Sequence, residues 1–437
     1  MRKIESCPVI ESTNPLTGYV ERCFEVEFIT PLYGGGVEAG LCDTTSPIRA
    51  PAIRGHLRFW WRATRGASFP DGKTLKENED KIWGSTELPS PVQIKIGQVE
   101  GRKRYRTYNA DNCYGFSRYG AEAYALFPAQ QNETPKLIKE GLTFTFLIKW
   151  PSDKDLEKDV YAAVWAWLNF GGIGARTRRG LGALFAKKVP DDISRDFCPQ
   201  NIENFGNWLK ANLKKFDISN DSPLGAWPVM PDAFYILPDI NDALSAWKVA
   251  LACLKRFRQG EKIGRDLGRG KRPGRSRWPE AESIRELAME QNSKRNRNDL
   301  RLKAKDSRIP TKYFPRAEFG LPIIFEIRNE NLKPTLIPGN NHERMASPLV
   351  LRPLRFSDGS HAALIYLFKT PPIREALLKP GEKDLLRDEL PIGEDQIRSS
   401  ELNKYQDSPM SSSTNTGSAL EAFQAFILKH NFQKVSI

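Results

Sequence analysis

The sequence predicts an α+β fold, because segments with the alternating pattern of β-strands are separated by segments with the spacing of amphipathic helices. In the first 190 residues the order is strand, helix, strand, strand, helix, strand, which is the ferredoxin-like β-α-β-β-α-β arrangement, as in RRM-like domains. The chain has 437 residues, of which 40% are hydrophobic, so it can form two or three domains with cores of their own.

Local patterns justify the elements of an N-terminal domain at residues 1–190. Phe24, Val26 and Phe28 alternate with polar residues, as in a strand with one buried face. Pro51 suits the first turn of a helix, where its missing N–H costs nothing. The expected elements are a strand at Arg22–Thr30, a glycine-rich loop at Pro31–Gly40, a helix from Pro51, a polar insertion at 67–90, strands at Val92–Ile96 and Leu142–Trp150, a helix at Asp155–Phe170, a glycine-rich loop at Gly171–Gly182 and a strand at Ala183–Val189.

The second half predicts another α+β domain at residues 223–370, after a polar connector at 191–222. The C-terminal part, residues 371–437, is expected to be a helical extension with a flexible Ser/Thr-rich linker at 394–417. The elements expected in these parts are helices at Ile202–Lys214, Ala243–Phe257 and Ala419–Lys429, and strands near Phe234, at Pro322–Arg328, near Leu349 and at Ala363–Phe368.

The charge is strongly positive and unevenly distributed. The net charge is +13, and residues 255–312, which include the basic insertion (259–312 of the second domain), hold 19 Lys+Arg against 8 Asp+Glu, so 19 − 8 = +11 lies in this stretch. A localised positive charge favours nucleic acid or an anionic surface as a partner.

Residues 46–66 are the most informative stretch, because they place arginines at helical spacing with no acid between Asp43 and Asp71. Arginines that repeat at i,i+4 repel one another, so this pattern suggests that an anion lies against them. The planar guanidinium suits phosphate, which points to a nucleic-acid backbone. The alternative is a solvated face beside an apolar stripe. The arginines are Arg49, Arg54, Arg58, Arg62 and Arg65.

The tryptophans of the same stretch are expected in the core. Trp61 lies next to the arginines and is the exception, a candidate for contact with RNA.

The loop Gly171–Gly182 (GGIGARTRRGLG) is a second candidate for phosphate contact. Glycines allow a backbone to approach phosphates closely, and the arginines supply charge. It is neither a Walker A loop nor a dinucleotide fingerprint, since no GK[ST] follows and it comes after a helix. The simpler alternative is a helix C-cap with solvated arginines. The candidate residues are Gly171, Gly172, Gly174, Arg176, Arg178 and Arg179.

The stretch Gln259–Glu280 is rich in glycine and arginine and poor in apolar residues. It predicts a disordered basic loop, an arm that orders on RNA, or both at once. Its candidate RNA contacts are Arg265, Arg269, Arg275 and Arg277.

No catalytic constellation emerges from the sequence. His56 lies in the arginine helix, but at about 100° per residue it points away from the arginines. Asp43 precedes the helix, where a turn or capping role is the commoner one. The six cysteines are scattered without a CxxC, so neither a zinc site nor a disulfide framework is indicated. We therefore expect no catalytic residue, no metal and no cofactor.

The start of the chain lacks the apolar core of a signal peptide, and the longest nearly apolar run, Tyr161–Ala175, is too short to span a membrane. A soluble cytoplasmic protein without a membrane partner is expected.

Taken together, several motifs resemble one family, the first subunit of the type III-B CRISPR–Cas (Cmr) effector complex, a member of the RAMP superfamily. They occur in order between Ile29 and about Leu351, and the last sixty-odd residues carry no matching motif. The motifs are ITPLYGGG (Ile29–Gly36), the arginine stretch, the loop Gly171–Gly182, SRWPEAESIRE (Ser276–Glu286), FGLPIIF (Phe319–Phe325) and RMASPL (Arg344–Leu349).

The resemblance implies two RAMP domains with ferredoxin-like cores and a non-catalytic RNA-binding subunit without a small-molecule substrate. Its partners would be the CRISPR guide RNA, the target RNA and other RAMP subunits, and it would hold the 3′ region of the guide and help capture the target. The family's RNA-contacting segments correspond to Arg54, Arg58, Arg62 and Gly171–Arg179, and a further one to Arg265–Arg277. Two alternatives stay open: a metal-independent RAMP endoribonuclease that uses His56 or Asp43, and a stand-alone basic RNA-binding protein.

Overall fold

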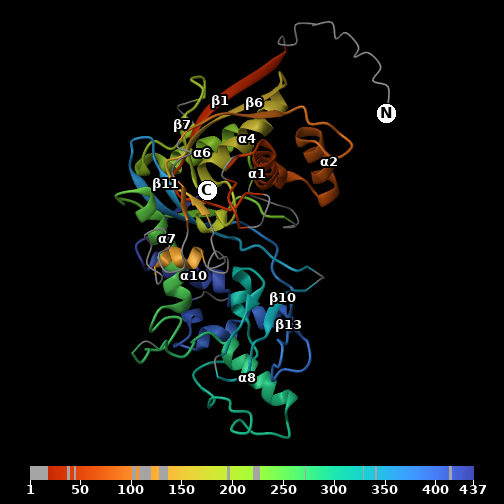
Figure 1. Ribbon diagram of the computed structural model, residues 1–437, viewed down its shortest axis with the longest axis vertical. Coiled ribbons are helices and arrows are strands. Elements are labelled where there is room, and N and C mark those ends of the chain that lie inside the picture. The colour runs from red at the N-terminus through yellow and green to blue at the C-terminus, as the bar shows by residue number, and fades with distance from the viewer. Residues whose placement is uncertain are drawn as a thin grey trace.

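The computed structural model describes the larger part of the chain, and Figure 1 shows how its elements are arranged. A unit around β1 and β6 lies at the top of this view, α7, α10 and β11 lie in the middle, and α8, β10 and β13 lie at the bottom. The described residues are 18–36, 40–43, 46–100, 105–107, 120–126, 136–193, 197–219, 227–270, 272–327, 329–339, 342–412 and 416–437.

The first unit has the β-α-β-β-α-β order along the chain. Its antiparallel sheet has the strand order β3-β6-β1-β7. In β6 every second residue is buried, and these residues join the apolar sides of α1 and α4 in one core. The elements are β1 (Tyr19–Phe28), α1 (Ala50–Ala63), β3 (Gln93–Glu100), β6 (Thr143–Pro151), α4 (Lys154–Phe170) and β7 (Leu184–Lys188).

The segment 67–90, expected to be a polar insertion, forms a helix that packs beside α1. Helix α2 (Gly72–Trp83) begins after Asp71, whose carboxylate accepts hydrogen bonds from the backbone N–H groups of Lys73 and Thr74, both at 2.8 Å. A short 3₁₀ helix, η1 (Arg65–Ser68), precedes it. Leu75 and Trp83 are buried in the core of the first unit.

A small sheet supports the loop that follows the first strand. Strands β2 (Leu32–Tyr33), β5 (Lys136–Ile138) and β4 (Tyr105–Thr107) are antiparallel neighbours, and the short helix α3 (Ala121–Ala125) lies between β4 and β5 in the chain. Most of the basic and aromatic segment 99–120 lies outside the described residues.

The second unit repeats the same order, with a sheet ordered β11-β12-β8-β15. One face of this sheet packs against α7 and α10, and the other packs against the first unit, where Phe234 meets Phe170 with ring centroids 4.8 Å apart. The elements are β8 (Ala233–Leu237), α7 (Ala243–Gln259), β11 (Leu349–Arg355), β12 (His361–Leu367), α10 (Ala419–Leu428) and β15 (Gln433–Ser436), preceded by the connector helix α6 (Ile202–Lys215).

This topology corrects the expected C-terminal extension. Because β15 pairs with β8, the last residues of the chain complete the second sheet and do not form a separate part. Most of the expected flexible linker 394–417 is also ordered, since Leu402 and Met410 are buried in the core of the second unit. Residues 413–415 of that linker lie outside the described part.

A third apolar cluster forms around α8 and a sheet ordered β14-β13-β10-β9. It combines the basic insertion with residues that come after β12, so two segments far apart in the sequence share one core. Its elements are α8 (Glu280–Gln291), the 3₁₀ helix η4 (Pro315–Phe319), β9 (Ile323–Ile324), β10 (Thr335–Pro338), β13 (Glu375–Lys379), β14 (Leu390–Gly393) and α9 (Glu394–Ile397), and the 3₁₀ helices η5 (Ser400–Lys404) and η6 (Pro409–Ser412) follow.

Candidate functional site

The arginines of α1 have carboxylate partners on the neighbouring helix α2. Arg58 donates to Glu79 at 2.5 Å and to Asp80 at 3.1 Å, and Arg62 donates to both Glu79 oxygens at 2.7 and 2.8 Å. Glu79 is only 2% exposed, so its charge needs these partners. The inference of an external anion from the absence of acids within the helix is therefore corrected: the acids are supplied from 17 and more residues away.

The other arginines of this stretch are also engaged within the chain. Arg54 donates to the carbonyl oxygens of Trp83 and Val92 at 3.3 and 3.0 Å. Arg65 pairs with Asp159 at 3.0 Å and with Asp217 at 2.8 Å. Such contacts fix α1 against α2, α4 and the segment after α6.

Replacing Glu79 by glutamine is expected to destabilise the chain by about 2–3 kcal/mol, because it removes the charge that Arg58 and Arg62 share in a buried position. The measurement is urea-induced unfolding. Glu77→Gln is the matched control, since Glu77 lies on the same helix, is exposed and only approaches Lys73 at 4.0 Å. Equal stability of the two variants would show that the α1 arginines do not depend on Glu79.

Trp61 belongs to the core and is not available to a base. Its side chain is 1% exposed, and its indole N–H donates to Asp159 Oδ1 at 2.9 Å. The expectation that Trp61 contacts RNA is corrected by this position, because neither ring face is open for stacking.

The two glycine-rich loops lie against each other beside the start of α1. The Ala175 N–H donates to the Tyr33 carbonyl at 2.7 Å, and a Cβ on Gly34 would come within 2.9 Å of the Ala175 Cβ. Arg49 donates to the Gly35 carbonyl at 2.6 Å, which fixes this loop to the N-terminal end of α1. The start of α1 and the two glycine-rich loops therefore lie side by side.

The arginines of the second glycine-rich loop hold the two units together. Arg179 donates to the Leu349 carbonyl at 2.8 Å and Arg178 to the Ser347 carbonyl, so both contact the start of the edge strand β11. Arg176 donates to the Ala125 carbonyl at 3.0 Å. Burial lowers the pKa of Arg179 to about 10, which leaves it protonated at neutral pH.

One feature of α1 was not singled out from the sequence. Gly55 is exposed in the helix interior, and a Cβ placed there would meet no atom within 4 Å. Phe59 follows four residues later on α1, and the Arg178 guanidinium lies 5.6 Å from the centre of its ring and 5.4 Å from that of Phe368. A glycine in a helix interior lowers stability by about 1 kcal/mol relative to alanine. A glycine that no close packing requires is therefore the sequence signal that could have identified this face of α1 as a candidate binding surface.

The structure shows the surroundings of the two candidate catalytic residues, His56 and Asp43. Burial lowers the pKa of His56 to about 4, far from the value near neutrality that suits a general base. Asp43 accepts a hydrogen bond from the backbone N–H of Ser46 at 2.9 Å, which is the turn role expected for it.

The basic stretch after α7 is a folded hairpin in the described residues and not a disordered arm. Arg277 pairs with Asp266 at 2.8 Å, Arg275 pairs with the buried Glu282, and Arg265 donates to the Gly274 carbonyl at 3.3 Å. These three arginines are therefore part of the hairpin's own structure.

Within the described residues, no group of three or more His, Cys, Asp or Glu side chains is placed to hold a metal ion. The helices of that same part of the chain include none with the length and apolar character needed to cross a membrane.

Sequence comparisons find relatives of this chain. A model of the RAMP superfamily matches residues 25–184, which covers most of the first unit. The chain is 27% identical over 194 residues to the CRISPR system Cmr subunit Cmr1-1 of Pyrococcus furiosus, a match that spans 44% of this chain and 55% of that protein. It is 30% identical over 180 residues to Cmr1-2 of the same organism, which spans 38% of this chain and 94% of that subunit.

Solved structures give weaker likenesses. The apo crystal structure of Cmr1 from P. furiosus has a TM-score of 0.47 and 18% identity, with 81% of this chain and 91% of that one covered. A chain of the type III-B Cmr-beta complex bound to cognate target RNA, seen by cryo-EM, has a TM-score of 0.48 and 13% identity, with 80% and 94% covered. The match along nearly the whole of Cmr1-2, together with the superfamily match, shows that this chain belongs to the Cmr1 family of the RAMP superfamily.

Proposed function

We propose that this protein is a non-catalytic RNA-binding subunit of a type III-B CRISPR effector complex, built on two ferredoxin-like units. Family membership carries the proposal, since the relatives are named as Cmr subunits. In this role it holds the 3′ region of the guide RNA, helps capture the target RNA and contacts other RAMP subunits. The guide's sequence is read by base pairing, so the protein needs only contacts to the RNA backbone.

The RNA-facing surface that we favour is the junction of α1 with the two glycine-rich loops. Gly55 offers an open face of α1. At the start of the same helix, Arg49 donates to the carbonyl of Gly35 in the first glycine-rich loop. Arg178, although it donates to the Ser347 carbonyl, adds positive charge beside Phe59. Arg54, Arg58, Arg62 and Arg65 contribute to this surface mainly by fixing α1, because their guanidinium groups are engaged by protein atoms.

The outer face of the first sheet is a less suitable RNA platform. In β1 the exposed side includes Glu21 and Glu25, and Glu25 is paired with Lys187 of β7 at 3.2 Å. RRM-like domains that bind RNA on the sheet stack bases on aromatic side chains, and carboxylates would repel the backbone. This favours the helix and loop side of the unit.

Replacing Gly55 by alanine is expected to raise stability by about 0.5–1 kcal/mol and to weaken RNA binding, because the new methyl group blocks the close approach of a backbone. Thermal unfolding and fluorescence anisotropy with labelled guide RNA measure the two effects. Gly206→Ala is the matched control, since Gly206 also lies inside a helix, with a new Cβ only in ordinary contact with Val435 at 3.4 Å. A Gly55→Ala protein that is more stable but binds RNA as before would remove Gly55 from the interface.

One preparation of the purified protein tests both its association with other Cmr subunits and its inability to cleave RNA. The protein is expected to co-purify with other Cmr subunits in the presence of guide RNA, and strictly monomeric behaviour would favour a stand-alone RNA-binding protein. Incubation with guide–target duplex is expected to leave the RNA intact. Site-specific cleavage that His56→Ala or Asp43→Ala abolishes would overturn the non-catalytic role.

A further inference from the structure

The basic hairpin, residues 261–270 and 272–277, is a pre-formed antiparallel ribbon. Its strands are joined by hydrogen bonds from Asp266 N–H to the Arg275 carbonyl at 2.8 Å and from Arg277 N–H to the Gly264 carbonyl at 3.0 Å. At the other end, Arg269 and Arg272 exchange backbone hydrogen bonds at 3.0 and 3.1 Å. The ribbon therefore has a closed tip and a fixed base.

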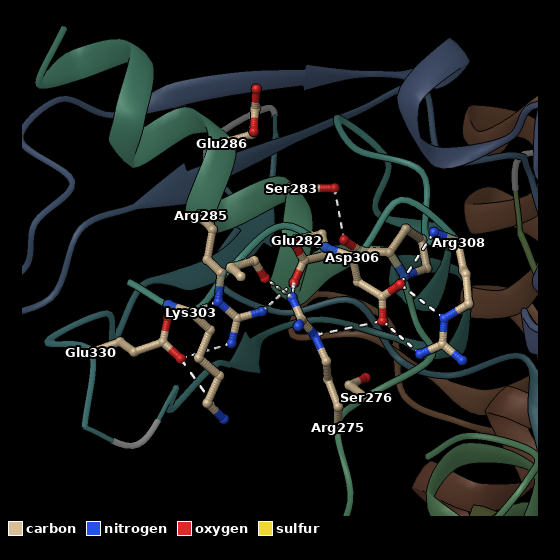
Figure 2. Close-up of polar contacts among 12 residues, drawn as sticks. Arg275, Ser276, Glu282, Ser283, Arg285, Glu286, Lys303, Asp306, Arg308 and Glu330 are labelled. Carbon is tan, nitrogen blue, oxygen red and sulfur yellow. Dashed lines mark hydrogen bonds and ion pairs between the residues drawn. The ribbon is translucent and has the colours of Figure 1, made fainter. Parts of the chain in front are cut away.

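The base of the basic hairpin is held by a buried ionic network. Figure 2 shows Arg275 reaching toward Glu282 of α8 and toward Asp306. Glu282 is only 1% exposed and also pairs with Arg285, which in turn binds both oxygens of Glu330 at 2.7 and 2.9 Å. Because buried charges of this kind are costly to separate, the orientation of Arg275 is strongly constrained.

The tip of the hairpin differs from the base in that its side chains are exposed and, within the described part of the chain, its arginines are not ion-paired. The side chains of Arg269 and Arg272 are exposed, and among the described residues neither guanidinium has an ion-pair partner. Leu267 is 60% exposed beside them. Of the two acids of the hairpin, Asp266 is paired with Arg277 and Arg308, while Glu261 accepts a hydrogen bond from the Gly268 N–H at 3.3 Å and brings one carboxylate close to the tip.

We propose that Leu267, Arg269 and Arg272 form a contact for an RNA strand, separate from the α1 surface, and that Glu282 is a positioning residue that aims this tip by holding Arg275. The arginines bind backbone phosphates, and Leu267 packs on a ribose or a base. An RNA strand fits better than a protein partner because, among the described residues, the two unpaired arginines outnumber the one carboxylate near the tip, that of Glu261, so the net charge of these groups is positive. The proposal rests on the RNA-binding function proposed above.

The test uses the full-length chain, a labelled single-stranded RNA and anisotropy titrations at several salt concentrations. The double variant Arg269→Ala/Arg272→Ala is expected to flatten the slope of log K against log salt by about 1.4, which is about 0.7 for each phosphate contact on a single strand. Lys210→Ala/Lys214→Ala removes equal charge from the exposed side of α6 and is expected to leave the slope nearly unchanged. Leu267→Ala is expected to weaken binding about three- to tenfold at an unchanged slope.

The variant Glu282→Gln distinguishes a role of Glu282 in orienting the hairpin tip from a role in the stability of the fold. It is expected to flatten the slope as the tip variant does, and to flatten it no further when combined with the tip variant. A fall in melting temperature with an unchanged slope would assign Glu282 a structural role only. If Glu282→Gln does not fold, the tip variants still decide the RNA contact.

The outcomes distinguish the two proposals. A wild-type chain that does not bind RNA would overturn the proposed function itself. RNA binding by the wild type with the same slope in the Arg269→Ala/Arg272→Ala protein would overturn the tip contact alone. Loss of co-purification with other Cmr subunits in that variant, at an unchanged RNA slope, would assign the tip to a protein partner instead.

Discussion

Replacing Arg352 by methionine is expected to destabilise the chain by about 3–5 kcal/mol and to loosen the contact between its two units. Arg352 lies on β11, is 1% exposed, and donates to three carbonyl groups: Gly171 at 2.9 Å, Leu184 at 3.1 Å and Pro353 at 3.0 Å. Two of these carbonyls belong to the first unit. Each buried carbonyl that loses its hydrogen-bond donor destabilises the folded state by about 1–3 kcal/mol.

The position of Arg352 also explains how a buried cation is tolerated. The Gly171 carbonyl lies at the C-terminal end of the 17-residue helix α4, where the partial charge of the helix is negative. Tyr366 of β12 donates to the Phe170 carbonyl at 2.7 Å and completes this cap. Burial lowers the pKa of Arg352 to about 10, so the side chain is still charged at neutral pH.

Urea-induced unfolding measures the Arg352 effect. Arg355→Met is the matched control, since Arg355 lies on the same strand, is partly exposed and pairs with Glu27 at 3.4 Å, so its loss is expected to cost less than about 1 kcal/mol. The stability of Arg352→Lys is expected to lie between those of Arg352→Met and Arg355→Met. One ammonium group cannot reproduce the planar guanidinium that donates to carbonyls of both units. Equal midpoints for Arg352→Met and Arg355→Met would contradict this account.

The regular elements could be predicted because their signals are local. The helix expected at Asp155–Phe170 is α4, and the one expected at Ala243–Phe257 is α7, each preceded by an aspartate that accepts hydrogen bonds from its first turn. The α+β class followed from the same signals. Apolar spacing and capping residues act within a few positions, so a single sequence contains them.

The partners of the arginines could not be predicted in the same way. Arg54, Arg179 and Arg352 donate to backbone carbonyls, which every residue carries and which no sequence pattern distinguishes. Glu79 could have been noticed, but only its long-range packing shows that it faces α1 and not solvent. Charge at helical spacing therefore indicated a polar face without indicating what binds to it.

The third core and the C-terminal strand escaped prediction for a related reason. The core around α8 joins the basic insertion to residues beyond β12, and pairing over such distances leaves no periodic trace in either segment. In the basic insertion, the density of arginine and glycine suggested disorder. The acids that fold it, Glu282 and Asp306, are few, but they are buried against the arginines.

Removing residues 417–437 is expected to abolish cooperative folding of the second unit. The truncation takes away β15, whose register with β8 pairs Val435 with Phe234, and leaves β8 as an unpaired edge. It also takes away α10, whose Phe423 and Phe426 lie 5.3 and 5.2 Å from Phe257 of α7 between ring centroids. Each buried phenylalanine of this kind contributes about 3–5 kcal/mol.

Limited proteolysis and far-UV circular dichroism measure the result, with cleavage expected to spread into residues 233–367 while the first unit resists. Point variants on α10 grade the effect: Phe423→Ala should cost about 3–5 kcal/mol, and Leu428→Ala, at an exposed position of the same helix, less than about 1 kcal/mol. If the truncated chain resisted protease as well as the full chain does, α10 and β15 would be a dispensable extension. The structure argues otherwise, because Glu318 of the third cluster accepts hydrogen bonds from Ser418 Oγ at 2.9 Å and from the first N–H of α10, which ties this helix to two cores at once.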